Sequence, residues 1–179
     1  MRIRFLSKAI LLFGLLCFSS CTKTFEGQNP VGQRFPSVNA EVLDGETVAL
    51  PEFFDGKRVL LLVGFIQDSQ FDIDRWVLAL KQLGIEIELA EIPAIQGWFP
   101  RLISNKINSG MREGIPEEEW GIVFTVYDDA VKIAEFLGNT TPRNARVVLL
   151  DSNGKVSWFY DRGYSAERAL ELHTLLGAS

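Results

Sequence analysis

Cysteine and histidine are scarce in this chain, and their scarcity limits its chemistry. The sequence of 179 residues has two cysteines, Cys17 and Cys21, and one histidine, His173. A chain cleaved before Cys21 would have no thiol in its folded part, hence no disulfide and no cysteine-ligated metal. Histidine metal sites need two or three such ligands. We therefore predict that the folded part binds no metal and no cofactor, and that His173 lies on a helix surface.

Positive charge is also in short supply. The chain has 18 basic and 23 acidic residues, a net charge of -5, and loss of residues 1–20 would remove three of the basic ones. Phosphate recognition depends on a basic stripe, which this sequence lacks. The acidic composition therefore argues against nucleic-acid binding and against electrostatic adhesion to anionic lipids.

Common active-site motifs are missing as well. The sequence contains no glycine-rich phosphate loop, no Gly-x-Ser-x-Gly and no His-Glu-x-x-His. Ser69 follows a predicted buried strand, but a serine nucleophile needs an adjacent base, and His173 lies far along the chain. We predict no catalytic residue.

The N-terminus has the layout of a secretory signal. Arg2, Arg4 and Lys8 precede the apolar run Ala9–Phe18, which is short of the roughly 20 residues that span a bilayer. The run ends in Phe18-Ser19-Ser20-Cys21, which resembles a bacterial lipobox. The alternatives are a soluble secreted protein cut near Ser20 and an uncleaved anchor.

A lipobox implies that Cys21 is acylated and becomes the N-terminus. Two or three acyl chains hold a protein on a membrane at about 0.8 kcal/mol per buried methylene. We predict a signal peptide at residues 1–20, the lipidated cysteine and a polar tether at 21–30, and one domain at 31–179. Thr22 resembles the residue that sends lipoproteins to the outer rather than the inner membrane, with the domain facing the periplasm.

The domain is predicted to be α/β. Six of the seven residues at 59–65 are apolar, which is typical of a central strand buried on both faces. Alternation and helical spacing predict a hairpin at 39–50, strands at 86–92, 122–127, 146–150 and 156–160, and helices at 69–83, 97–107, 129–137 and 165–176. Residues 110–120, with two glycines and a proline, are predicted to be a loop. This order implies a mixed sheet with helices on both faces.

Further expectations concern individual side chains. Ser69 or Asp72 is expected to cap the first helix, and Leu102 to face inward from the second. Alternation of acid and aliphatic residues predicts a solvated strand surface for Glu86, Glu88 and Glu91. Trp98, Trp120, Trp158 and Tyr160 are expected in the core or at its rim; a group of exposed aromatic residues among them would instead indicate a protein-binding patch.

Two predicted loops at the ends of strands supply the candidate binding residues. These candidates are Gln67, Asp68, Ser69, Gln70, Met111, Arg112 and Pro116. Arg112 is the most suggestive, since a constrained loop could aim its guanidinium at an anion or a partner. The alternative is an exposed salt bridge to Glu113, Glu117 or another acid, worth about 0–1 kcal/mol.

Several short elements point together to one family. They are Gly32-Gln33-Arg34-Phe35-Pro36, Leu60–Leu62, Trp76, Gly110-Met111-Arg112 with Ile115-Pro116, Tyr127–Asp129, and Val148–Asp151 with Gly154, Trp158 and Gly163. Over about residues 31–172 the chain resembles the mitochondrial ATP synthase assembly-factor family, which chaperones subunit a and is itself similar to thioredoxin and peroxiredoxin folds. The resemblance implies a thioredoxin-like three-layer sandwich.

The chain departs from thiol-active members of that fold at two places. The loop after the central strand has no Cys-x-x-Cys, and Ala145 stands where a cis-proline often lies. We therefore predict a lipid-anchored, non-catalytic binding or assembly module of the bacterial envelope, with an envelope or membrane protein as its client. The alternatives are a peroxiredoxin- or thiol-oxidoreductase-type enzyme with a displaced, non-cysteine active group, and a small-anion carrier that uses Arg112.

Overall fold

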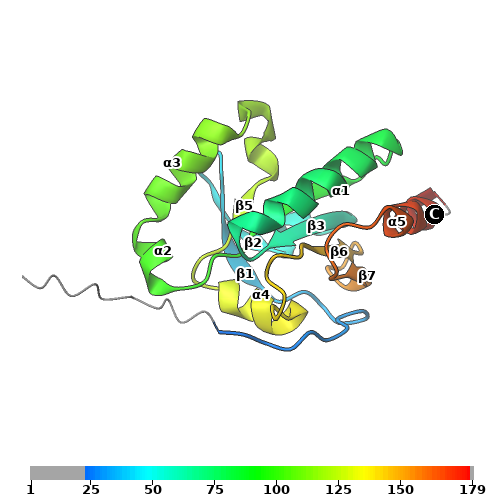
Figure 1. Cartoon of the computed structure of the whole chain (residues 1–179), viewed down its shortest axis with the longest axis horizontal. Coiled ribbons are helices and arrows are strands. Elements are labelled where there is room, and N and C mark those ends of the chain that lie inside the picture. Colours follow the sequence, from blue (N-terminus) through cyan, green and yellow to red (C-terminus); the bar gives the residue numbers. More distant parts are fainter. Residues whose placement is uncertain (1–22, 178–179) are drawn as a thin grey trace, which may run out of the picture.

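A four-stranded mixed sheet forms the centre of the computed structural model, which describes residues 23–177. Its strand order is β4 (Glu88–Pro93), β3 (Val59–Gly64), β6 (Arg146–Leu150) and β7 (Val156–Tyr160) (Figure 1). Strand β3 runs parallel to β4 and antiparallel to β6, and all six of its residues are buried. The prediction of a central strand buried on both faces is confirmed.

A smaller sheet adjoins β4. Here β1 (Val38–Val42) pairs antiparallel with β2 (Thr47–Leu50), as the predicted hairpin requires, and with the short β5 (Phe124–Thr125). Isolated parallel bridges link β4 and the residue after it to residues that flank β5. The strand predicted at 122–127 is therefore reduced to two residues, and part of the preceding predicted loop forms the 3-10 helix η3 (Glu117–Ile122).

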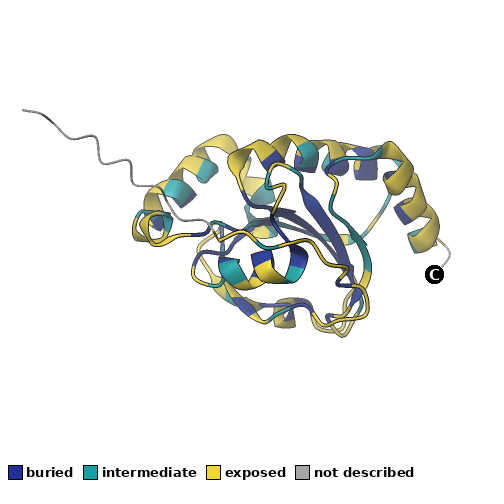
Figure 2. Ribbon diagram, turned by 60° about the horizontal axis from the view of Figure 1, so that its bottom comes forward, coloured by how far each residue is buried: buried dark blue, intermediate teal, exposed yellow. Residues whose placement is uncertain are grey.

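Helices cover both faces of the central sheet, because alternate residues of β3 point to opposite sides. Leu60 and Leu62 face α1 (Gln70–Gln82) and α5 (Ala166–Gly177) in one hydrophobic cluster. Val59, Leu61 and Val63 pack in a second cluster that includes α4 (Ala130–Leu137). Figure 2 shows the strands buried in the interior and the helices exposed on their outer sides. The α/β prediction with helices on both faces is confirmed.

The first helix has the buried face that its spacing predicts. Ile73, Trp76 and Leu80 are buried in the sheet-facing cluster. The Trp76 indole Nε1 donates a hydrogen bond of 2.9 Å to the Gly163 carbonyl. This bond ties α1 to the segment between β7 and α5. Gly84 follows the helix with a positive φ of 63°, as expected of a residue that ends one.

The predicted second helix is two helices. Helix α2 (Trp98–Leu102) ends where Ile103 leaves helical geometry (φ -110°, ψ 20°), and α3 (Ser104–Gly114) begins immediately after it. Because of this break, residues of α2 and α3 do not share one continuous helix face. Leu102 is 73% exposed, so the prediction that it faces inward is wrong. Helix α3 also takes in the first half of the loop predicted at 110–120.

The described part of the predicted tether lies against the domain. Phe25 packs against the cluster that contains α4, and its N–H donates to the Asn139 Oδ1 at 2.7 Å. Asn139 in turn donates from Nδ2 to the Lys23 carbonyl at 2.8 Å and from its own N–H to the Phe25 carbonyl at 3.0 Å. Gly138 has φ +72°, and a Cβ there would lie 2.3 Å from the Gly27 Cα. The predicted signal peptide and the predicted lipidation site, Cys21, lie outside the described residues.

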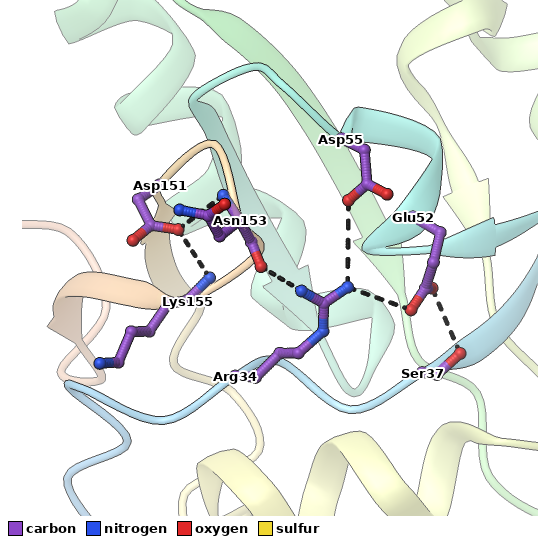
Figure 3. A network of polar contacts seen from close by, with 7 residues as sticks. All are labelled: Arg34, Ser37, Glu52, Asp55, Asp151, Asn153 and Lys155. Carbon is purple, nitrogen blue, oxygen red and sulfur yellow. Dashed lines mark hydrogen bonds and ion pairs between the residues drawn. The ribbon is translucent and has the colours of Figure 1, made fainter.

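Arg34 joins three separate segments of the chain (Figure 3). Its guanidinium donates to the Asn153 carbonyl in the turn between β6 and β7, and lies 3.3 Å from the Glu52 carboxylate at the start of η1 (Glu52–Phe54). Asp151 stabilises the same turn by accepting N–H hydrogen bonds of 2.9 Å from Asn153 and Lys155. The network fixes the entry of the chain into the domain. In residues 23–177 no helix is long and apolar enough to cross a membrane.

Candidate functional site

In the loop after β3, a buried serine hydroxyl is hydrogen-bonded to a backbone carbonyl of the same loop. Ser69 is 1% exposed, and its hydroxyl donates a hydrogen bond of 2.5 Å to the Ile66 carbonyl. A Cβ on Gly64 would lie 2.4 Å from this hydroxyl oxygen, so the glycine makes room for it. Ser69 occupies the residue before α1 but makes no side-chain capping bond, and neither does Asp72, so the predicted cap is wrong. A buried hydroxyl bonded to a carbonyl is unavailable as a nucleophile.

An apolar cleft of about 770 Å³ opens beside this loop. One wall comes from the loop and the start of α1, the other from α3, and the floor from β4 and the residues that follow it. The lining residues are Gly64, Phe65, Ile66, Gln67, Ser69, Gln70, Ile73, Glu91, Pro93, Ile95, Ile107, Gly110, Met111, Gly114 and Ile115. Its volume lies in the usual range of small-molecule pockets.

Glu91 is the ionisable side chain among these lining residues. Burial raises the pKa of Glu91 to about 7, and the nearby carboxylates of Asp74 and Glu119 act in the same direction, whereas a hydrogen bond from Gln70 opposes them. Glu91 is half-buried, so the prediction of a solvated surface is wrong for Glu91 but holds for Glu86 and Glu88, which are exposed. Near neutral pH the Glu91 carboxyl group can either donate or accept a hydrogen bond.

The cleft brings together residues from both predicted binding segments. Gln67, Ser69 and Gln70 lie on one wall and Met111 on the other, 41 or more positions away in sequence. Pro116 does not line the cleft; it is exposed and precedes η3. The grouping of the first four is what the sequence reasoning anticipated, and their role in binding stays a prediction.

Two charged candidates have other partners. Asp68 forms an ion pair of 2.8 Å with Arg143. Arg112 lies in the last turn of α3 rather than in a loop, and its Nε donates to the Leu43 carbonyl at 2.7 Å. Its guanidinium carbon is 5.8 Å from the centre of the Trp120 ring. Arg112 therefore holds α3 against the β1–β2 hairpin. The predicted salt bridge to Glu113 or Glu117 is not among its contacts in the described residues, and its role in binding an anion or a partner stays a prediction.

A buried arginine contacts Phe65, which precedes the loop after β3, and the backbone of the segment before β6. Arg146 is 2% exposed, and its Nη1 donates to the Thr141 and Asn144 carbonyls at 2.7 and 2.5 Å. Its guanidinium carbon lies 5.2 Å from the centre of the Phe65 ring, and burial lowers the pKa of Arg146. Next to it, the Ala145 N–H donates to the Asp72 carboxylate at 3.3 Å. Ala145 is thus buried and bonded at the place where the resemblance implies a cis-proline.

The sequence did not show that Glu91 and Ile95 line a cleft. Ile107 was expected to face inward from the predicted second helix, and it lies on the cleft wall in α3. No local signal shows that residues of α3 lie across the cleft from the loop after β3. No group of three or more histidine, cysteine, aspartate or glutamate side chains that could hold a metal occurs within residues 23–177. The geometry thus offers an apolar surface with one titratable carboxyl group.

Solved structures similar to this chain share a thioredoxin-like fold. A SCO1/SenC family lipoprotein from Bacillus anthracis matches with a TM-score of 0.58 at 13% identity over 84% of this chain and 98% of its own. The exposed lipoprotein thioredoxin Etrx1 of Streptococcus pneumoniae gives 0.51 at 14% identity, over 79% and 100%. A reduced 2-Cys peroxiredoxin from Plasmodium vivax gives 0.50 at 18% identity, over 84% and 83%.

These similarities establish the fold class. The chain has a thioredoxin-like α/β fold with a mixed four-stranded central sheet, as predicted. No protein-family model matches the chain, and no curated protein sequence does. The resemblance to the ATP synthase assembly factors therefore gains no support from these comparisons.

Proposed function

We propose that this protein is a thioredoxin-like binding module that holds an apolar segment of a partner protein in the cleft between α1 and α3. The observation that carries the proposal is the cleft itself. It opens at the end of β3, where the sequence has no thiol and Ser69 is locked to a carbonyl. The fold thus keeps its usual place for substrate contact but presents an apolar surface there.

The chemistry of the cleft favours an aliphatic or aromatic side chain with a polar group beside it. Ile66, Ile107 and Met111 supply flexible apolar contacts on both walls. Glu91 on the floor can accept a hydrogen bond from a backbone or side-chain N–H of the bound segment. An extended or helical stretch of polypeptide satisfies both requirements.

The place of action is proposed from the N-terminus. Acylation of Cys21 after removal of residues 1–20 would tie the module to a bacterial envelope membrane, facing the periplasm, with the outer membrane favoured by Thr22. Its client would then be an envelope or membrane protein. The resemblance to the assembly factors of ATP synthase favours a membrane protein under assembly.

Gly110 offers a way to block the cleft without distorting the fold. A Cβ added at Gly110 would meet no atom within 4 Å, and the residue lies on the cleft wall in α3. We expect Gly110→Phe to abolish partner binding, whereas Gly110→Ala should retain it. Gly121→Phe is a matched control, because Gly121 is equally unhindered but does not line the cleft.

The assay is photo-crosslinking of the full chain in its own membranes. A photoreactive residue at Met111 or at Ile66 should capture the same client, and the same residue at the exposed Leu170 on α5 should not. Gly110→Phe should remove the adduct. Capture that persists in Gly110→Phe would refute the cleft as the binding site.

The fold neighbours favour one alternative, a thiol-oxidoreductase-type enzyme with a displaced active group. Peroxide consumption and insulin reduction by the purified protein test it directly. Turnover that depends on Ser69 or Arg112 would support the enzyme and contradict the binding module. We expect no turnover, since reduction of a disulfide by the fold's usual route needs a cysteine thiolate.

A further inference from the structure

Helix α2 exposes three large apolar side chains in five residues. Trp98, Phe99 and Leu102 are 71%, 54% and 73% exposed, and no residue of α2 is buried. The Trp98 and Phe99 rings meet edge to face with their centres 5.9 Å apart. Exposed apolar side chains that gather in this way mark a contact surface.

Ion pairs of α2 and hydrogen bonds of the adjoining α3 attach this segment to the domain and orient its exposed face. Arg101 in α2 contacts the Glu41 carboxylate at 2.5 Å and the Asp128 carboxylate at 3.0 Å. In α3, Asn108 donates to Glu41 at 2.9 Å and accepts from the Tyr127 hydroxyl at 2.7 Å. The polar side of the α2–α3 segment therefore faces the domain, and the apolar side chains of α2 face outward.

The charge of this segment differs from that of the rest of the chain. Residues 94–112 include Arg101, Lys106 and Arg112 but no acidic residue, although the whole chain has a net charge of -5. Lys106 is exposed on α3. Arg101 is paired with two acidic side chains, Glu41 and Asp128. Lys106 then remains as an exposed basic side chain near the apolar tip, and apolar residues beside a basic one are typical of helices that lie in a membrane interface.

The described chain begins at the same end of the molecule. In Figures 1 and 2 the first described residues lie on the side that carries α2, and α5 lies at the opposite end. Lys23 is fixed there by the hydrogen bond from Asn139 to its carbonyl. Cys21 is two residues earlier, so an extended chain places it within roughly 7 Å of Lys23. An acyl group on Cys21 would therefore enter a bilayer beside α2.

We propose that α2 is the membrane-contacting tip of the anchored protein and that Trp98, Phe99 and Leu102 insert into the interfacial region of the bilayer. The inference rests on the proposed acylation of Cys21. The acyl chains supply the affinity, and α2 sets the orientation, because one anchor point alone leaves the domain free to rotate. Tryptophan favours the level of the lipid headgroups, where its ring is half in hydrocarbon and its N–H is hydrated.

The proposed orientation has a consequence for the cleft. Helix α3 follows α2 directly and forms one wall of the cleft. With α2 in the interface, the cleft lies close to the membrane surface. It would then meet a client segment as that segment leaves or enters the bilayer.

Tryptophan quenching by lipid tests the inference. The full chain, expressed with its own leader, is reconstituted in phosphatidylcholine vesicles with brominated acyl chains, after mass spectrometry of its mature N-terminus. We expect part of the tryptophan emission to be quenched. Trp98→Phe should abolish the quenching, and Trp158→Phe, which alters a tryptophan that contacts Glu171 of α5, should leave it in place.

A second variant keeps the Trp98 fluorescence reporter and removes the other two side chains that are proposed to insert into the bilayer. Phe99→Ser combined with Leu102→Ser removes apolar surface that is exposed in the domain, so folding should be unaffected. Trp98 should then lose its quenching and shift its emission to longer wavelength. An acylated protein whose Trp98 is not quenched overturns the membrane tip alone. A mature chain without an acyl group on Cys21 overturns the anchor and the tip together.

Discussion

Replacing Glu91 by glutamine should stabilise the protein in mildly alkaline solution and change its stability little in acid. Burial against the cleft is the main cause that raises the pKa of Glu91 from 4.5 to about 7, and Asp74 and Glu119 add to it. Glutamine has nearly the same shape and can keep a hydrogen bond with Gln70, but it has no charge to bury. The variant therefore isolates the cost of ionising this side chain.

The sign of this pH dependence of stability follows from proton binding to Glu91 in the folded and unfolded states. Between pH 4.5 and about 7 the folded protein keeps a proton on Glu91 that the unfolded chain has released. The free energy of unfolding contributed by this group is thus fully present below pH 4.5 and is lost as the pH rises through about 7. At 1.36 kcal/mol for each pKa unit, the full difference is about 3 kcal/mol, an upper bound because water reaches part of the side chain.

Urea unfolding of the wild type and Glu91→Gln at a series of pH values measures the effect. The difference in unfolding free energy should be small at about pH 4 and should approach 2–3 kcal/mol in favour of the variant at about pH 8. Glu86→Gln is the control, since Glu86 is exposed just before the same strand. A difference between wild type and Glu91→Gln that stays constant over this range would refute the burial argument.

Three further substitutions test other parts of the structure. Gly138→Ala should destabilise the protein by about 2 kcal/mol or more and speed proteolysis at residues 23–30, because its Cβ would collide with the Gly27 backbone at a positive φ. Trp76→Phe should cost about 2–3 kcal/mol in urea unfolding, because the Gly163 carbonyl loses its buried donor. Arg146→Lys should lower the unfolding free energy by about 1–3 kcal/mol, since an ammonium lacks the second nitrogen that donates to the Thr141 hydroxyl and the planar group that lies over the Phe65 ring.

The strands of the central sheet were predictable because their burial repeats along the chain. The apolar run at 59–65 and the two strands at 146–150 and 156–160 each match the structure closely. In each case the side chains alternate or are uniformly apolar, and turn residues mark the ends. For these strands the local sequence is sufficient to predict their position and burial.

The α2–α3 region was not predictable in the same way. Gly110 and Gly114 each disfavour a helix by about 1 kcal/mol, which predicts a loop. The structure extends α3 through both because Met111 packs over the cleft and Arg112 binds the Leu43 carbonyl, 69 residues away in sequence. Likewise, Glu91 lies near Gln70 and Asp74 of α1, which precedes it, and near Glu119 of η3, which follows it. Contacts of this range leave no periodic signal in a sequence.

The attachment of residues 23–33 has a mechanical consequence. Asn139 holds Lys23 and Phe25, and further on Gly32 and Gln33 pair with Val156 at the edge of the central sheet. A force applied at the N-terminus would break these hydrogen bonds one after another. The hydrogen bonds between the strands of the central sheet would not bear the force until residues 23–33 had detached. The released segment would add roughly 30 Å of extended chain. A protein tethered to a surface and placed under tension could therefore lengthen by releasing residues 23–33 while its central sheet stays intact.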